Sequence, residues 1–234
     1  LFYREDVATD WSIAMCDVGQ GDAFVINLGD AEGWLIDTGP PDSGLLLCLD
    51  RLGIATLGKV FITHTHSDHF GAIRELEESK VRIGDRMVST GFDLELWPGA
   101  RVLEPGTRQT AGEVSFEVVG HEAQYAQYAE HNDTSLVIRF SFSTPSGTVD
   151  FFAAGDMETE AMDRLLRLHP QGQAAILKAS HHGARNGGTQ IIEQIHPQIL
   201  LVSAGKDNSY GHPHPETLDM AKRIGATVLR TDQS

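Results

Sequence analysis

The segment Phe61–Ile73, which reads FITHTHSDHFGAI, concentrates side chains that can bind metal. Three histidines and one aspartate occupy six positions after an apolar run, namely His64, His66, Asp68 and His69. Imidazole and carboxylate groups together suit zinc, manganese or iron. His64 and His66 are two positions apart and can face one side, whereas Asp68 and His69 continue around the turn toward a second point. The pattern predicts a metal site, in preference to surface histidines on a loop or a helix cap by Asp68.

Further ligands must come from later parts of the chain, because one cluster cannot complete two coordination shells. Asp156, in FFAAGDMETE, follows an apolar stretch and could bridge two metals or cap a helix. His181 and His182, in ILKASHHGARNGG, follow another apolar stretch. Neighbours in an extended chain point in opposite directions, so we expect one of them to bind metal and the other to contact substrate or support the structure. His212, in NSYGHPHP, could be a ligand, a general acid, a phosphate contact or a turn residue.

The composition limits the broad class of protein. The chain has 234 residues, of which 41% are apolar, and this is enough for a sizeable core. A net charge of −15 argues against broad electrostatic binding of nucleic acid, although a local basic patch would still bind phosphate. No apolar run is long enough to span a membrane, and the abrupt ends suggest a fragment of a longer protein. Cys16 and Cys48, which lie in apolar contexts, are predicted to be buried free thiols.

The candidate ligands lie after short apolar runs that we expect to be strands. Strands are predicted at 11–16, 23–28, 33–36, 59–63, 135–142, 148–154, 174–179, 198–203 and 227–230, with further short strands within 81–120. Helices are predicted at 45–52, capped by Asp42 or Ser43, and at 71–78, 158–168, 189–195 and 215–224. The polar stretch 121–133 is predicted to be a loop. Two strand-rich halves without a linker predict one α/β domain over 1–234, with two sheets face to face and helices outside.

These motifs together resemble the metallo-β-lactamase fold, through H-x-H-x-D-H after a strand, a later Gly-Asp and a strand-end histidine. The resemblance covers nearly the whole chain and implies a four-layer αββα sandwich with a dinuclear metal site at one edge. A narrower resemblance rests on CDVGQGDAFVI, WLIDTGP, NDTSLVIRF, AAGDMETEAM, ILKASHHGARNG and GKDNSYGHPHPETLDMAKRIGATVLRTD. In this order, the motifs are similar to the C-terminal metallo-β-lactamase-like domain of the ComEC/Rec2 family of competence DNA-internalisation proteins.

The resemblance implies a ligand for each metal position. The implied set is His64 and His66 on one ion, Asp68, His69 and His182 on the other, and Asp156 between them. The fold usually supplies a third histidine to the first ion, but here Asn132 stands in that place, with His131 just before it. The first site is therefore weaker, more open or completed by His131, and one or two zinc or manganese ions fit. Asp22, in GQGD, begins a strand near the expected site, where it could be a further ligand or a turn carboxylate.

The metal site and the resemblance together predict a hydrolase. Two ions would activate water and stabilise charge on a phosphoryl oxygen. Asp68 would bind metal and orient the nucleophile, and His212, His181 or Lys178, in that order, would serve the leaving oxygen. Lys178, Arg185, Lys206 and Arg230 could supply local phosphate contacts.

The family resemblance also implies a substrate, partners and a location. The substrate would be the DNA strand that is not imported, and the partner the rest of a membrane-embedded channel, with the domain outside the cytoplasm. Nothing indicates a stable homo-oligomer. A small-molecule ester hydrolase and a non-catalytic docking domain of the channel are the competing hypotheses.

Overall fold

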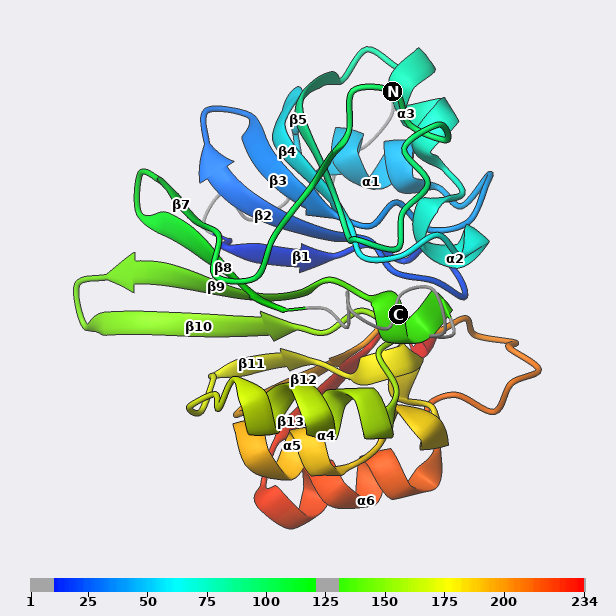
Figure 1. Cartoon of the computed structure of the whole chain (residues 1–234). Coiled ribbons are helices and arrows are strands. Elements are labelled where there is room, and N and C mark those ends of the chain that lie inside the picture. Colours follow the sequence, from blue (N-terminus) through cyan, green and yellow to red (C-terminus); the bar gives the residue numbers. More distant parts are fainter. Residues whose placement is uncertain (1–10, 121–130, 234) are drawn as a thin grey trace.

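Two β-sheets lie face to face between two layers of helices (Figure 1). The computed structural model describes residues 11–120 and 131–233, except for the side chain of His131. Within these residues the first sheet has the order β1-β2-β3-β4-β5-β6. Its strands are β1 (Ile13–Met15), β2 (Phe24–Gly29), β3 (Glu32–Ile36), β4 (Thr56–Ile62), β5 (Arg82–Val88) and β6 (Arg101–Val102).

The second sheet has the order β13-β12-β11-β10-β9-β8-β7. Its strands are β7 (Arg108–Ala111), β8 (Val114–Gly120), β9 (Val137–Thr144), β10 (Gly147–Ala153), β11 (Ile176–Lys178), β12 (Ile199–Val202) and β13 (Thr227–Arg230). Strands β10 to β13 run parallel, as do β3 to β6, whereas the remaining pairs are antiparallel. Parallel strands bring their carboxyl ends to the same edge of a sheet, and this edge carries the candidate site.

Helices cover the outer face of each sheet (Figure 1). The first sheet is covered by α1 (Leu45–Arg51), α2 (Ser67–Phe70) and α3 (Ile73–Glu78), and the second by α4 (Thr159–Leu168), α5 (Gln190–Ile195) and α6 (Pro215–Ile224). Short 3-10 turns occur at η2 (His131–Thr134), η3 (Ser180–Gly183), η4 (Arg185–Gly187) and η5 (Thr231–Gln233). The layers confirm the αββα sandwich expected from the sequence.

The core between the sheets is aromatic. Phe61 of β4 lies 5.0 Å, between ring centroids, from Phe116 of β8 and 5.5 Å from Phe140 of β9. Side chains of a strand alternate between its two faces. Phe151 of β10 therefore packs between the sheets, while its neighbour Phe152 packs against the outer helices. This alternation lets one strand pack against both the opposite sheet and the outer helices.

Most predicted elements are present within a few residues of their expected bounds. The helix predicted at 71–78 differs, because the helical region begins at Ser67 and is divided into α2 and α3. Gly71 lies at the division, and a Cβ there would lie 2.3 Å from the Ser67 carbonyl oxygen and 2.4 Å from Pro41 Cδ. The predicted cap of α1 was also wrong, since Gly44 takes this position with a φ of 80°. The predicted loop at 121–130 lies outside the described residues.

The prediction that Cys16 and Cys48 are free thiols was wrong, because they form a disulfide. Their Cα atoms are 5.9 Å apart, within the range of such bonds, although 32 positions separate the residues in sequence. The bond joins the chain just after β1 to α1. It therefore anchors the loop that leads from Cys16 to Asp22. None of the helices in the described part of the chain is long and apolar enough to cross a membrane.

Candidate metal centre

The predicted ligands gather at the edge where the loops after β4, β10 and β11 meet, at the right of Figure 1. Asp68 and His69 lie on α2, Asp156 follows β10, and His182 lies on η3 after β11. His69, Asp156 and His182 are buried, and the side chain of Asp68 is 33% exposed. The fold thus brings together residues that are more than one hundred positions apart in sequence.

Four side-chain atoms of these residues converge, and we call the four residues the donor cluster. His69 Nε2 lies 3.1 Å from Asp156 Oδ2 and 3.4 Å from His182 Nε2. His182 Nε2 lies 3.2 Å from Asp156 Oδ2 and 3.3 Å from Asp68 Oδ2. Ligands at a metal–ligand distance of about 2.0–2.1 Å in a tetrahedron are about 3.3 Å apart. The spacing of the donor cluster therefore fits one metal ion.

The two histidines of the donor cluster are held by their outer nitrogens. His69 Nδ1 lies 2.8 Å from Asp37 Oδ2, and His182 Nδ1 lies 2.9 Å from the carbonyl oxygen of Ser203. Donating Nδ1–H to an oxygen leaves the Nε2 lone pair for a metal. Asp37 in turn accepts hydrogen bonds from the backbone N–H and the hydroxyl of Thr63, at 2.7 and 2.8 Å. Sequence reasoning did not single out Asp37; its position after β3, in WLIDTGP, was the available signal.

Asp22 and Lys178 form a buried ion pair behind the donor cluster. Lys178 Nζ lies 2.5 Å from Asp22 Oδ2 and 3.1 Å from Asp156 Oδ1, and it donates to the carbonyl oxygen of Gly155 at 2.7 Å. Lys178 thereby leaves Asp156 Oδ2 to face the histidines. Asp22 belongs with His69, Asp156 and His182 to a group whose candidate ligand atoms lie within 4.8 Å of one another. However, its Oδ1 faces His182 Nδ1 at 3.2 Å, so its place is behind the ring.

Lys178 is only 1% exposed, and this bears on its expected role. A side chain that is buried and engaged by two carboxylates does not reach a substrate from this position. The geometry therefore favours a structural role for Lys178 over contact with a leaving group or phosphate. Of the other expected phosphate contacts, Arg230 pairs with Asp232 at 2.6 Å and Arg185 approaches Glu216 at 3.5 Å.

His64 and His66 lie beside the donor cluster. The ring centroid of His64 is 4.2 Å from that of His69 and 4.7 Å from that of His66. His64 is buried, and its Nδ1 lies 3.2 Å from the Thr63 hydroxyl, whereas its Nε2 has no hydrogen-bond partner among the described residues. A buried polar atom without a partner calls for an explanation such as a bound ion. The donor types and this unpaired nitrogen fit a metal beside the donor cluster.

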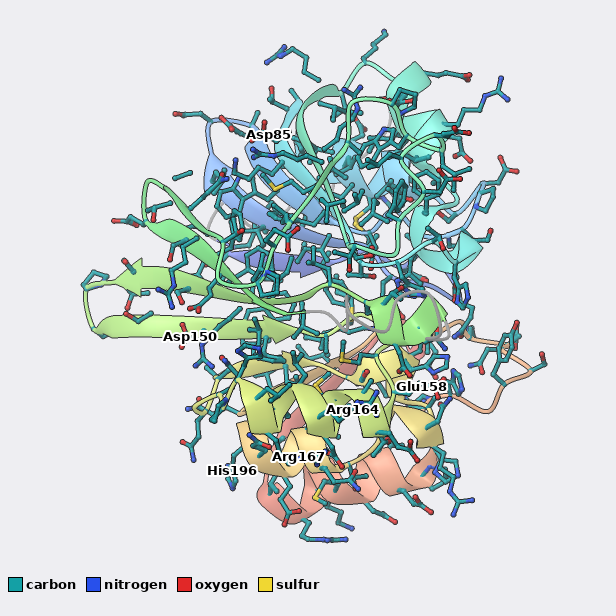
Figure 2. The ribbon with its side chains drawn as sticks, viewed as in Figure 1. Asp85, Asp150, Glu158, Arg164, Arg167 and His196 are labelled. Carbon is teal, nitrogen blue, oxygen red and sulfur yellow. A yellow bond between two sulfur atoms is a disulfide. The ribbon has the colours of Figure 1, made fainter. Side chains whose placement is uncertain are left out.

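Asn132 occupies the region where a third histidine was expected for the first ion. Its Nδ2 donates to Glu158 Oε1 at 3.0 Å, while its Oδ1 is buried without a hydrogen-bond partner in the described structure. Glu158, labelled at this edge in Figure 2, also accepts from Asn186 Nδ2 at 2.7 Å. The hydrogen bond to Glu158 therefore fixes the Asn132 side chain and leaves Oδ1 as its unpaired atom. His131 begins η2, but its side chain lies outside the described residues.

His181 and His212 lie toward the outside of the donor cluster. His181 and His182 both adopt left-handed backbone conformations, with φ of 49° and 55°, so the extended chain assumed for this segment was wrong. His182 is nevertheless buried in the donor cluster, whereas the side chain of His181 is 20% exposed, with Nε2 3.8 Å from Asp156 Oδ2. The His212 ring lies 5.7 Å from that of His181, and its Nδ1 lies 3.4 Å from Gln20 Nε2.

The electrostatics of the centre favour a cation. Burial by itself lowers the pKa of His69, but the carboxylates of Asp156 and Asp37 outweigh it and raise this pKa to about 10. Burial likewise opposes the charge of Asp156, yet His182, His69 and Lys178 hold the pKa of Asp156 well below its usual value. The Asp156 carboxylate thus remains charged and draws protons onto the imidazoles. A divalent ion would replace those protons.

The pKa of His212 is shifted in the opposite direction from that of His69, because few carboxylates face His212. Partial burial, followed by the neighbouring His181 and His182, lowers the pKa of His212 to about 4. At pH 7 this imidazole is neutral. A neutral imidazole donates one N–H to a substrate oxygen but holds no second proton to transfer.

Comparisons with known proteins agree with this geometry. Residues 16–81 match the metallo-beta-lactamase superfamily model. The chain is 29% identical to ComE operon protein 3 of Bacillus subtilis over 100% of the chain and 33% of that protein. It is 24% identical to competence protein ComA of Neisseria gonorrhoeae over 95% of the chain and 31% of that protein. The chain thus spans about a third of the length of these relatives.

A solved structure shows the same fold. The metal-dependent hydrolase Tm1679 of the beta-lactamase superfamily superimposes with a TM-score of 0.57 at 12% identity, over 93% of this chain and 94% of Tm1679. At this identity the likeness concerns the fold alone. Taken with the donor cluster, these findings show that the chain has the metallo-β-lactamase fold and that it resembles the ComEC/Rec2 competence proteins.

Proposed function

We propose that this chain is a metal-dependent phosphodiesterase that hydrolyses DNA, acting on the strand that is not imported during competence DNA uptake. The convergence of His69 Nε2, His182 Nε2, Asp156 Oδ2 and Asp68 Oδ2 at separations of 3.1–3.4 Å is the observation that carries the proposal. The names of two relatives, competence protein ComA of Neisseria gonorrhoeae and recombination protein 2 of Haemophilus influenzae, support DNA as the substrate.

The chemistry divides between the bound metal and the residues around it. A divalent ion held by the donor cluster, with a second held by His64 and His66, would act as a Lewis acid toward a phosphoryl oxygen and acidify an attacking water. Asp68 is the most exposed member of the donor cluster, so its carboxylate orients the attacking water. His181 and His212, which lie farther out, donate N–H groups to the phosphoryl and leaving oxygens.

The disulfide supports a location outside the cytoplasm. Disulfides persist in oxidising compartments and are rare in the cytosol of most organisms. The Cys16–Cys48 bond adjoins the loop that leads to Asp22 of the candidate site. An extracytoplasmic position would place the domain where incoming duplex DNA arrives. The rest of a membrane-embedded DNA channel would then be its partner.

Cleavage of end-labelled DNA by the purified protein, with added manganese or zinc, tests the proposal. We expect His66→Ala and Asp68→Ala each to reduce the rate at least about 100-fold, because removing even a side chain that only supports a ligand costs about 10–100-fold. Asp85→Asn, in β5 away from the site, is the matched control (Figure 2). Cleavage that survives both substitutions would refute the proposal. Hydrolysis of small phosphodiesters without any cleavage of DNA would favour a small-molecule esterase.

A further inference from the structure

Tyr210 presents an exposed aromatic ring next to the candidate metal centre. It is 71% exposed and lies on the loop between β12 and α6, which projects from the site edge (Figure 1). Its ring centroid is 5.6 Å from that of His212, with 28° between the planes. The His212 ring in turn lies 6.3 Å from that of His182, with 22° between the planes. A stack of rings therefore leads from solvent to a residue of the donor cluster.

The loop that carries Tyr210 is held in place by hydrogen bonds. Asn208 Nδ2 donates to the carbonyl oxygens of Gly205 and His212, both at 2.8 Å. Asn208 Oδ1 accepts from the backbone N–H of His212 at 3.0 Å, so Tyr210 lies within a closed hydrogen-bonded turn. The next residues are anchored as well, because the N–H of His214 donates to the Gly183 carbonyl oxygen at 2.8 Å. A ring on an ordered loop requires less ordering of the backbone when a ligand stacks on it.

We infer that Tyr210 is a stacking platform for an unpaired nucleobase beside the phosphate that is cleaved. This inference rests on the proposed function and names its substrate class, single-stranded DNA or a frayed end. Every base presents a π face, so stacking binds single strands without sequence preference. In an intact duplex the same face is covered by the neighbouring base pair.

The charge of the chain favours a contact of this kind. With a net charge of −15, the surface offers little general attraction to a polyanion. Stacking supplies affinity that does not depend on releasing counterions, so salt weakens it little. Lys206 is exposed on the same loop, and we assign to it the contact with a neighbouring phosphate.

The test compares two single-stranded oligonucleotides that differ at one nucleotide. One carries a normal base beside the cleaved phosphate, and the other carries an abasic sugar there. Cleavage kinetics are measured with manganese for the wild type, Tyr210→Ala, Tyr210→Phe and the control Leu168→Ala, which removes an apolar side chain that is 64% exposed on α4. We expect Tyr210→Ala to raise KM for the normal oligonucleotide roughly 5- to 100-fold. Tyr210→Phe and Leu168→Ala should leave KM for the normal oligonucleotide close to the wild-type value. For the abasic oligonucleotide, Tyr210→Ala and the wild type should have similar KM values.

The outcomes separate the two proposals. If the wild type cleaves DNA but Tyr210→Ala leaves KM unchanged, or raises it equally for both oligonucleotides, the stacking inference is wrong and the proposed function stands. If the wild type cleaves neither oligonucleotide, the proposed function fails and the stacking inference fails with it.

Discussion

Replacing Lys178 with methionine should destabilise the fold by about 3–5 kcal/mol, because it leaves two buried carboxylates without their counter-charge. The ammonium lies 2.5 Å from Asp22 Oδ2 and 3.1 Å from Asp156 Oδ1. At an effective dielectric constant of about 20, these separations correspond to attractions of about 7 and 5 kcal/mol. The cost of removing the three charges from water offsets much of this. The loss measured when one partner of a buried pair is removed is therefore smaller than the sum of the attractions.

Urea denaturation of the metal-free protein measures this loss as a change in the free energy of unfolding. The double variant Lys178→Met/Asp22→Asn is the control, because it removes one charge of each sign, and it should recover a large part of the stability. Added metal should stabilise Lys178→Met more than the wild type, since an ion supplies positive charge beside Asp156. A loss below about 1 kcal/mol, or no recovery in the double variant, would refute the assignment of Lys178 to holding these carboxylates.

Three further outcomes follow from the contacts of the centre. Asp156 and Asp37 overcome the effect of burial and raise the pKa of His69 to about 10. Both ring nitrogens of His69 are therefore protonated at pH 7, and a metal must displace the proton on Nε2. Metal affinity should then rise with pH between about 6 and 9, by up to about tenfold per pH unit for each displaced proton. Calorimetry in two buffers counts the protons that are released on binding. Release of no proton would contradict the assignment of His69 as a protonated metal ligand. Asp37→Asn, which removes the carboxylate 2.8 Å from His69 Nδ1, should weaken metal binding about 10- to 100-fold, and equal affinity by metal titration would exclude this orienting role. Cys16→Ala/Cys48→Ala should lower the free energy of unfolding by about 3–4 kcal/mol, as expected for a closed loop of this length, and a reductant should destabilise the wild type but not the double variant.

Much of the fold and the metal-binding character could be predicted from the sequence, because both depend on local patterns. Alternation and apolar runs located the strands, and the spacing in THTHSDH indicated a metal site without knowledge of any distant residue. The predicted residues His69, Asp156 and His182 do lie together, since loops after parallel strands share an edge. Asn132 was also noted from the sequence, as a departure from the expected histidine.

Other features were decided by tertiary packing. Asp22 and Lys178 are 156 positions apart, and no local pattern shows that one ammonium would be enclosed by Asp22 and Asp156. The disulfide arises because α1 packs against the end of β1, and sequence context alone suggested free thiols. The sequence by itself therefore determined which chemistry the chain can perform, since residue type and spacing specify the donor atoms. Only the tertiary structure decided which donors face a metal and which hold the others in place, because that depends on contacts between strands and loops far apart in the chain.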